Sequence, residues 1–206
     1  MAHGRLITFE GSDGAGKTTQ LRALAAHLRA DGREVIETRE PGGAPGAEMI
    51  RALLVEGAPG RWSPETEILL FTAARRDHLE RTIAPALERG DLVLCDRFVD
   101  STRVYQGAVR ADLRGMVDAL HARAIGRDPD LTLILDLEPE CALARGRARG
   151  SLEDRFEQFG LDFQIRLRAG FLALAAEFPG RCRVIDADGP EDAVTARVIA
   201  AVAEAA

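Results

Sequence analysis

Lysine is nearly absent from this chain, although basic residues are common in it. The sequence contains 27 lysine and arginine residues together, and Lys17 is the only lysine. The wide, planar guanidinium group of arginine suits bidentate contacts, whereas a lysine ammonium is a compact point charge on a flexible stem. A chain that uses arginine almost everywhere has therefore kept one ammonium at one position, which indicates a specific task for Lys17.

Other scarcities exclude several classes of protein. The three cysteines are widely spaced and fit neither a disulfide framework nor a zinc site, so we expect free thiols and a cytoplasmic location. No apolar stretch is long enough for a transmembrane helix, and residues 1–5 carry no signal-peptide pattern, so no membrane association is expected. The formal net charge of −6 argues against a nucleic-acid partner, while leaving room for a local basic patch.

Patterns typical of strands and helices alternate along the chain. Apolar, β-branched runs predict strands at 6–10, 34–38, 92–96, 131–137 and 183–186. Apolar residues at helical spacing predict helices at 18–30, 46–56, 64–89, 112–126, 139–149, 158–178 and 190–205. This alternation predicts an α/β fold in which a five-stranded parallel sheet has helices on both faces. A length of 206 residues suits one domain over 1–206, with ligands beyond the carboxyl ends of the strands.

Lys17 lies in a phosphate-binding motif between the first predicted strand and the first predicted helix. Residues 11–18 read GSDGAGKT and fit the P-loop pattern G-x-x-x-x-G-K-[ST]. In that motif, backbone N–H groups and a helix N-terminus face an anion, and glycines let the backbone approach phosphate closely. Lys17 would reach the β- and γ-phosphate oxygens, and Thr18 offers a hydroxyl to Mg²⁺. The motif predicts a site for a nucleoside triphosphate.

Segments that follow the other strands carry further candidates, most of them with two interpretations. Arg39 follows the second strand and either is solvated or faces an anionic substrate. Phe71 and Arg75 share a helix face, where they either bind a nucleobase together or form a core phenylalanine beside a surface arginine. Asp96 ends a buried strand near the P-loop, which is typical of a residue that supports Mg²⁺. Tyr105, the only tyrosine, either belongs to the site or is an interface or core aromatic.

Arginines concentrate between 145 and 157, after the fourth strand and its helix. This segment reads RGRARGSLEDRFE and is interrupted by glycines. Such a basic run is either a solvated surface or a lid that closes over the triphosphate and carries arginine fingers. We place the Arg-rich lid at approximately 146–158.

Several of these motifs together resemble a known family. They are FEGSDGAGKTT at 9–19, TREPGG at 38–43, the pair Phe71 and Arg75, DRF at 96–98 leading to YQG at 105–107, and the Arg-rich lid. From end to end the chain resembles the thymidylate kinases (dTMP kinases). The P-loop alone occurs in many nucleotide-binding proteins, whereas TREPGG combined with DRF and YQG is much more specific.

The resemblance implies a fold, a reaction and an assembly. The fold would be that of the P-loop nucleoside monophosphate kinases, with a five-stranded parallel sheet and a lid. The enzyme would transfer a phosphoryl group from Mg-ATP to dTMP, giving ADP and dTDP, which is a step in dTTP biosynthesis. It would need Mg²⁺ and form a homodimer. The remaining alternatives are a kinase for another nucleotide or a deoxynucleoside, and a P-loop switch that signals through a partner.

The resemblance also implies how dTMP is bound. Phe71 would stack on thymine, Arg75 would hydrogen-bond it, and Thr102 would face it. Tyr105 would crowd the 2′ position of the sugar, and Asp13 would contact the 3′-hydroxyl. The residues that would hold the acceptor phosphate are Arg39, Arg51 and Arg97.

Roles at ATP follow from the same resemblance. The residues implied to bind ATP are Gly11, Ser12, Asp13, Gly14, Ala15, Gly16, Lys17, Thr18, Thr19 and Arg145. Mg²⁺ would be held by Thr18 and Asp96. The implied catalytic residues are Lys17, Arg97, Asp13 and a lid arginine. The lid is implied because the family places a key arginine either in the P-loop or in the lid, and the variable P-loop positions 12–15 contain no arginine. Arg149 is the first choice for the lid arginine and Arg155 the second.

Overall fold

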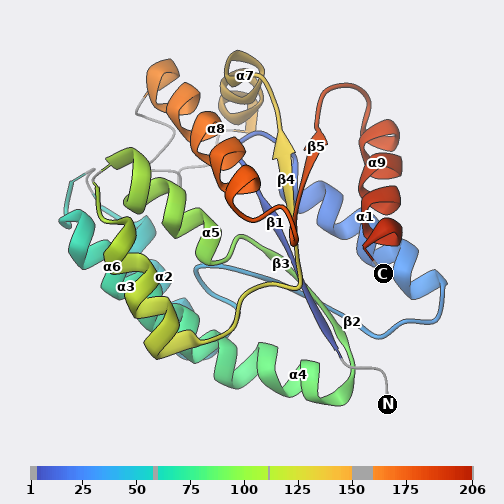
Figure 1. Ribbon diagram of the computed structural model, residues 1–206, viewed down its shortest axis with the longest axis horizontal. Coiled ribbons are helices and arrows are strands. Elements are labelled where there is room, and N and C mark those ends of the chain that lie inside the picture. The colour runs from blue at the N-terminus through green and yellow to red at the C-terminus, as the bar shows by residue number, and fades with distance from the viewer. Residues whose placement is uncertain (1–3, 58–59, 111, 150–159, 206) are drawn as a thin grey trace.

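A five-stranded parallel sheet forms the centre of the molecule, as the computed structural model shows (Figure 1). The structure describes residues 4–57, 60–110, 112–149 and 160–205, without the side chains of 108–110 and 146–149. The strands are β1 (Arg5–Glu10), β2 (Val35–Arg39), β3 (Leu92–Asp96), β4 (Leu131–Asp136) and β5 (Cys182–Asp186). Their order across the sheet is β2-β3-β1-β4-β5, and all neighbouring pairs are parallel. The predicted α/β architecture is therefore confirmed.

Position in the sheet explains the composition of the strands. The inner strands β3 and β4 are buried along almost their whole length, which is why their sequences are nearly continuous apolar runs. The edge strand β2 instead alternates between buried or half-buried and exposed side chains. In β1, Ile7 and Phe9 belong to one buried cluster and Leu6 to another, as the two-residue repeat of a strand requires. Both faces of the sheet are thus covered.

Helices cover the sheet from both sides (Figure 1). They are α1 (Lys17–Ala30), α2 (Pro45–Val55), α3 (Pro64–His78), α4 (Ala84–Arg89), α5 (Val99–Thr102), α6 (Arg114–Leu120), α7 (Pro139–Arg149), α8 (Gly160–Glu177) and α9 (Glu191–Glu204). Among the described residues, three π-helical segments continue helices without a break: η1 (Leu79–Ile83), η2 (Arg103–Arg110) and η3 (His121–Ile125). Leu24 of α1 and Val198 of α9 pack on one face, whereas Ile68 of α3 and Val117 of α6 pack on the other.

The structure agrees with the predicted elements, with one omission. The long helix expected at 64–89 is present as the continuous run α3, η1 and α4. The omission is the helical run formed by α5 and η2 after β3. Its buried face includes the polar residues Asp100, Thr102 and Gln106, so apolar periodicity does not reveal it. This missed helix carries several residues of the candidate site.

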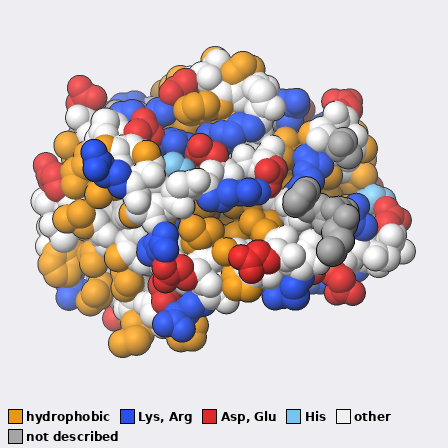
Figure 2. Space-filling view, turned by 60° about the horizontal axis from the view of Figure 1, so that its bottom comes forward, with side chains coloured by type: hydrophobic (Ala, Val, Ile, Leu, Met, Phe, Trp, Pro, Cys, Tyr) orange, Lys and Arg blue, Asp and Glu red, His pale blue; other side chains and the backbone are white. Residues whose placement is uncertain are grey.

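Charges of both signs are mixed on one face of the molecule (Figure 2). On the face seen in Figure 2, basic and acidic side chains lie interspersed with hydrophobic ones rather than in separate regions. Within the described ranges, no helix is both long and apolar enough to cross a lipid bilayer.

Strand register brings the candidate segments together. Phe9 of β1 and Arg39 of β2 both pair with Asp96 at the end of β3. The P-loop, the TREPGG segment and the DRF segment therefore leave the sheet side by side, at the edge where parallel sheets bind ligands.

Candidate active site

The P-loop lies tightly against the end of β4 and the start of α7. Gly11 and Gly14 have φ angles of 131° and 91°, in the region that favours glycine. A Cβ atom on Gly14 would lie 2.1 Å from the carbonyl oxygen of Ala142, and one on Gly11 would lie 2.6 Å from that of Leu135. Glycine is thus required at both positions, because the loop is in direct backbone contact with its neighbours.

Lys17 is enclosed by the loop to which it belongs. Its Nζ donates to the carbonyl oxygens of Gly11 and Ser12, at 3.1 and 2.9 Å, and lies 3.7 Å from Oδ1 of Asp13. Burial lowers the pKa of Lys17, and the nearby charge of Arg97 lowers it further. The ammonium is therefore desolvated within the loop, where an anion would interact with it strongly.

Thr18, the last residue of the P-loop motif, and Asp96 present neighbouring oxygen atoms. The Thr18 hydroxyl donates to Oδ2 of Asp96 at 2.5 Å, and Thr18 is exposed on the first turn of α1, as is Thr19. Among the described residues, no group of three or more His, Cys, Asp or Glu side chains could hold a metal ion. A hydroxyl and a carboxylate suit Mg²⁺, which prefers few protein ligands together with water and substrate phosphates. These residues fit the expected ion.

A cavity opens beside the P-loop. The P-loop, the TREPGG segment, α2, α3, the DRF segment, α5 and η2 contribute to its lining. The predicted residues that it brings together are Asp13, Arg51, Phe71, Arg75, Arg97, Thr102 and Tyr105.

Phe71 and Arg75 line one wall of the cavity. Phe71 is only half-buried, whereas Arg75 is 3% exposed. Nε of Arg75 donates to Glu40 at 2.6 Å and Nη2 donates to the Thr102 hydroxyl at 3.1 Å, while the guanidinium lies over the ring of Phe98. The alternative of a core phenylalanine beside a surface arginine is therefore wrong, and further N–H groups of Arg75 remain for a ligand.

Sequence reasoning missed the buried group that holds Arg75. Glu40 accepts from Arg75 and lies 3.0 Å from Nδ1 of His78, whose Nε2 is 2.7 Å from the Thr38 hydroxyl. The two ring nitrogens of His78 thus contact Glu40 on one side and Thr38 on the other. The only available signal was the spacing of Arg75 and His78, which puts both side chains on one face of α3.

Arg97 connects the cavity to the P-loop. Its Nη2 donates to Oδ1 of Asp13, its Nη1 donates to the Ser101 hydroxyl at 3.0 Å, and its guanidinium lies over the Tyr105 ring. The Tyr105 hydroxyl donates to Oδ2 of Asp13 at 3.4 Å. Burial raises the pKa of Asp13, but the charges of Arg97 and Lys17 outweigh this and lower it overall. Asp13 is therefore an ionised link between the two cations.

Tyr105 belongs to both the site and the core. Its ring makes edge-to-face contacts with Phe163 and Phe171 of α8, at centroid distances of 6.1 and 6.3 Å, and it also lines the cavity. Burial raises the pKa of its hydroxyl, so Tyr105 is neutral and can donate. The two interpretations of this residue are therefore compatible.

The remaining arginines differ in position. Arg51 lines the cavity and donates to the carbonyl oxygen of Pro41 at 2.7 Å. Arg39 lies outside the cavity lining and pairs with Glu48 of α2 at 3.1 Å, because it ends an edge strand where its side chain is exposed. The structure thus brings Arg51 to the site but leaves Arg39 at its margin.

Arg145, expected to bind ATP, lies on α7 and outside the cavity lining. Nη1 of Arg145 donates to the carbonyl oxygen of Ala187 at 3.4 Å, and Nη2 lies 3.9 Å from Asp188, so α7 meets the loop after β5 here. The side chain of Arg149 and the whole of Arg155 lie outside the described residues, so the expected lid arginine has no described position.

Comparisons with known proteins agree with this geometry. The family model described as thymidylate kinase matches residues 9–198. A thymidylate kinase of Dinoroseobacter shibae is 66% identical over 98% of both chains, and one of Caulobacter vibrioides is 58% identical over 96% of this chain and 95% of the relative. The crystal structure of a thymidylate kinase from Ehrlichia chaffeensis superposes with a TM-score of 0.78 at 34% identity, covering 97% of this chain and 99% of that one. A family match along nearly the whole sequence, together with a P-loop beside an arginine-lined cavity, shows that this chain belongs to the thymidylate kinase family.

Proposed function

We propose that this protein transfers a phosphoryl group from Mg-ATP to dTMP, giving ADP and dTDP, as a step in dTTP biosynthesis. The observation that carries the proposal is a single cavity in which Phe71 and Arg75 line one wall, Arg51 also contributes to the lining, and Arg97 reaches Asp13 of the P-loop. An aromatic ring with a buried guanidinium suits a nucleobase, and two further arginines suit a monophosphate.

In this proposal dTMP lies with its base between Phe71 and Arg75. Thr102, which already accepts from Arg75, would face the same edge of the base. Asp13 would meet the 3′-hydroxyl, and Tyr105 would crowd the 2′ position so that deoxyribose is favoured. Arg97 and Arg51 would hold the acceptor phosphate. Arg39 would contribute only after releasing Glu48.

ATP would bind across the P-loop, with Arg145 near adenine. The backbone of residues 11–19 would surround the β- and γ-phosphates, where Lys17 offers its ammonium. Thr18 and Asp96 would hold Mg²⁺, which supplies charge neutralisation on the phosphates when bound.

The reaction needs positioning and charge neutralisation more than covalent help. A phosphate oxygen of dTMP attacks the γ-phosphorus of ATP, and the bond from that phosphorus to the β,γ-bridging oxygen breaks to release ADP. The acceptor is already an anion, so no general base is needed. Lys17 holds the donor phosphates, Arg97 holds the acceptor, and Asp13 lies between them and orients both cations.

A lid arginine would complete the charge neutralisation. We propose Arg149 for this role, with Arg155 as the second choice, within a lid at approximately 146–158 of a single domain spanning 1–206. Closure of such a lid over the triphosphate would exclude water and suppress wasteful hydrolysis of ATP.

Carboxylates in the cavity argue against a neutral acceptor. A deoxynucleoside kinase requires a base to activate a hydroxyl group. Glu40 is already engaged by Arg75 and His78, and Asp13 is engaged by Arg97 and Lys17. The charges of Arg97 and Lys17 lower the pKa of Asp13 and make it a weak proton acceptor. An anionic acceptor therefore fits the cavity better.

The test is release of ADP from Mg-ATP with each nucleoside monophosphate offered in turn. We expect strong stimulation by dTMP, weak stimulation by dUMP, and none by thymidine, which lacks the phosphate. Equal rates across the panel would contradict the proposal and favour a nucleotide-binding switch.

We also propose that the protein forms a homodimer through α2 and α3. These helices pack together around Ala47 and Ala74, and they expose Met49, Leu53 and Leu69 at 76%, 39% and 51%. Exposed apolar side chains gathered on adjacent helices are typical of an interface. Sedimentation analysis should give a dimer for the natural chain and a monomer for Met49→Glu.

A cytoplasmic location fits the thiols. Cys95 and Cys182 are buried and Cys141 is exposed, and none of the three forms a disulfide. An exposed free thiol suits a reducing compartment. Fractionation of cells that express the protein tests this location.

A further inference from the structure

Arg97 has an unusual backbone conformation that its neighbours must maintain. In the described part of the chain, it is the residue other than glycine with a positive φ, at 70°. Such a conformation is disfavoured for a residue with a Cβ atom and persists only where surrounding contacts impose it. The Arg97 N–H donates to the carbonyl oxygen of Phe9 at 2.9 Å, and the next N–H, from Phe98, donates to Oε1 of Glu10 at 2.8 Å. The end of β1 thus fixes the backbone on both sides of Arg97.

Glu10 also acts on the guanidinium of Arg97 through a hydroxyl group. Oε2 of Glu10 accepts from Ser101 at 2.5 Å, and the Ser101 oxygen accepts from Nη1 of Arg97 at 3.0 Å. An arginine cannot accept a hydrogen bond, so the Ser101 proton has to point toward Glu10. The two hydrogen bonds therefore run in one direction, from Arg97 to Ser101 and from Ser101 to Glu10. We call this chain of donors and acceptors the relay, and it requires an acceptor at Oε2 of Glu10.

The ionised carboxylate of Glu10 makes an unfavourable contribution to the stability of the fold. Glu10 is fully buried; burial, together with the charge of Asp100 in α5, raises its pKa to about 7 despite the opposing charge of Arg97. Because burial disfavours the charged form, an ionised Glu10 does not contribute to stability by its charge. The specific property of Glu10 is that one side chain holds both the backbone after Arg97 and the hydroxyl beside its guanidinium.

We infer that Glu10 is a positioning residue for the acceptor phosphate, acting through the Phe98 N–H and Ser101 to aim Arg97. This inference rests on the proposed function, in which Arg97 holds the phosphate of dTMP. Glu10 itself touches neither substrate. Removal of its Oε2 acceptor should weaken binding of a phosphorylated acceptor without changing the base site or the ATP site.

Glu10→Gln is the variant that separates these effects. The amide keeps the shape of the side chain and an acceptor for Phe98, but its nitrogen cannot accept the Ser101 proton. We expect KM for dTMP to rise about tenfold, which corresponds to the loss of one hydrogen bond that involves a charged group. KM for ATP and the Kd of thymidine should stay within about twofold of the natural values. Glu37→Gln, an exposed exchange of the same kind on β2, should change none of the three.

Ser101→Ala tests whether Glu10 acts through the relay. This variant keeps the bond from Phe98 to Glu10 and removes only the link to Arg97. If the two residues form one relay, the double variant should raise KM for dTMP about as much as the larger single change. Additive losses would contradict the relay. Should Glu10→Gln fail to fold, Ser101→Ala alone must show the loss specific to dTMP, and its absence would overturn the inference.

Two further outcomes separate the inference from the proposed function. An equal loss of affinity for dTMP and thymidine in Glu10→Gln would make Glu10 a general support and overturn the inference. If dTMP does not stimulate ADP release by the natural protein, the proposed function itself fails, and the inference fails with it.

Discussion

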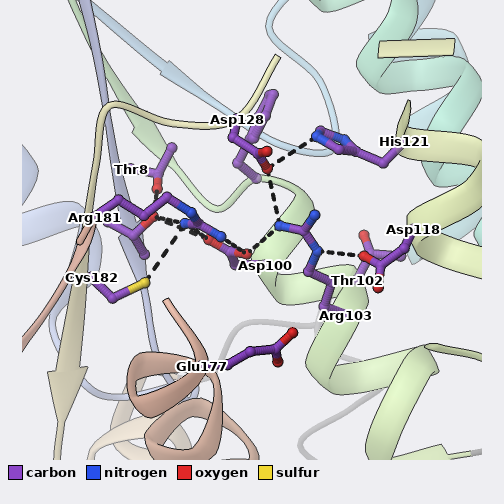
Figure 3. A network of polar contacts seen from close by, with 12 residues as sticks. Thr8, Asp100, Thr102, Arg103, Asp118, His121, Asp128, Glu177, Arg181 and Cys182 are labelled. Carbon is purple, nitrogen blue, oxygen red and sulfur yellow. Dashed lines mark hydrogen bonds and ion pairs between the residues drawn. The ribbon is translucent and has the colours of Figure 1, made fainter. Parts of the chain in front are cut away.

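Asp100 and Arg181 form a buried bidentate ion pair between α5 and the residue before β5. Nη1 of Arg181 donates to Oδ2 of Asp100 at 2.5 Å and Nη2 donates to Oδ1 at 2.9 Å. Arg103 donates to the same carboxylate at 2.9 Å, and Figure 3 shows Asp100 between the two arginines. The pair fixes the short helix that presents Ser101 and Thr102 to the cavity.

Removing the charge of Asp100 should destabilise the fold strongly. Asp100→Asn would leave two largely buried guanidinium groups without their shared carboxylate, so we expect a loss of about 3–5 kcal/mol in the free energy of unfolding. Asp118→Asn is the matched control, since Asp118 also pairs with Arg103 but is 41% exposed, and it should cost less than about 1 kcal/mol. Urea unfolding of both variants measures the difference. Similar losses of unfolding free energy in the two variants would mean that burial does not determine how much Asp100 stabilises the fold.

Lys17 should be essential for turnover but not for folding. Lys17→Ala removes the ammonium that faces the phosphates, and we expect kcat to fall about a thousandfold or more while the circular dichroism spectrum is unchanged. Lys17→Arg should not restore activity, because the guanidinium group is too wide for the space inside the loop. Rapid turnover by the arginine variant would show that charge alone is sufficient.

Phe71 should contribute to dTMP binding through stacking. Phe71→Ala removes a half-buried ring, so the melting temperature should change little, whereas KM for dTMP should rise about tenfold to a hundredfold, as expected for one lost stacking contact. Arg75 is less suitable for this test, because its removal leaves Glu40 buried without a cation. An unchanged KM for dTMP would place the base elsewhere.

The pKa of Glu10 predicts a dependence of stability on pH. Burial raises this pKa from 4.5 to about 7, so between these values the folded protein binds a proton that the unfolded chain has released. Stability should therefore fall as pH rises from about 4.5 to about 7. Measured against Glu10→Gln, which lacks the titration, the natural protein should lose about 3 kcal/mol over this interval, at about 1.36 kcal/mol per pKa unit. If the difference in stability between the two proteins stayed constant from about pH 4.5 to about pH 7, the pKa of Glu10 would not be raised by folding.

The arginines of the proposed lid can be separated by rate. Arg149→Ala should lower kcat by about a thousandfold or more with little change in dTMP affinity, because an arginine finger acts on the transferring phosphoryl group. Arg155→Ala should have a smaller effect. Rapid-quench kinetics distinguish the two, and the reverse ranking would assign the role to Arg155.

Local patterns predicted most of the fold. Strands such as β4 and helices such as α9 follow from apolar runs and helical spacing, and the P-loop follows from its glycines and Lys17. The helix formed by α5 and η2 was missed because its buried face is polar and is satisfied by partners far away in the sequence, such as Arg181.

The candidate site was predicted less completely than the fold. Seven predicted residues do line one cavity, since strand ends and helix faces fix their positions. Arg39 was expected to face the acceptor phosphate, yet it pairs with Glu48. Sequence spacing does not reveal that a neighbouring carboxylate competes for this arginine. Glu10 and Glu40 escaped notice because their roles depend on hydrogen bonds formed only after folding.

Contact between Gly14 and Ala142 has a mechanical consequence. Gly14 has no side chain, so the backbone of the P-loop packs directly against the backbone of Ala142 in α7. No flexible side chain lies between them. A shift of α7 toward the loop would press directly on the backbone of Gly14, so this contact links the helix that carries Arg145 to the loop that carries Lys17.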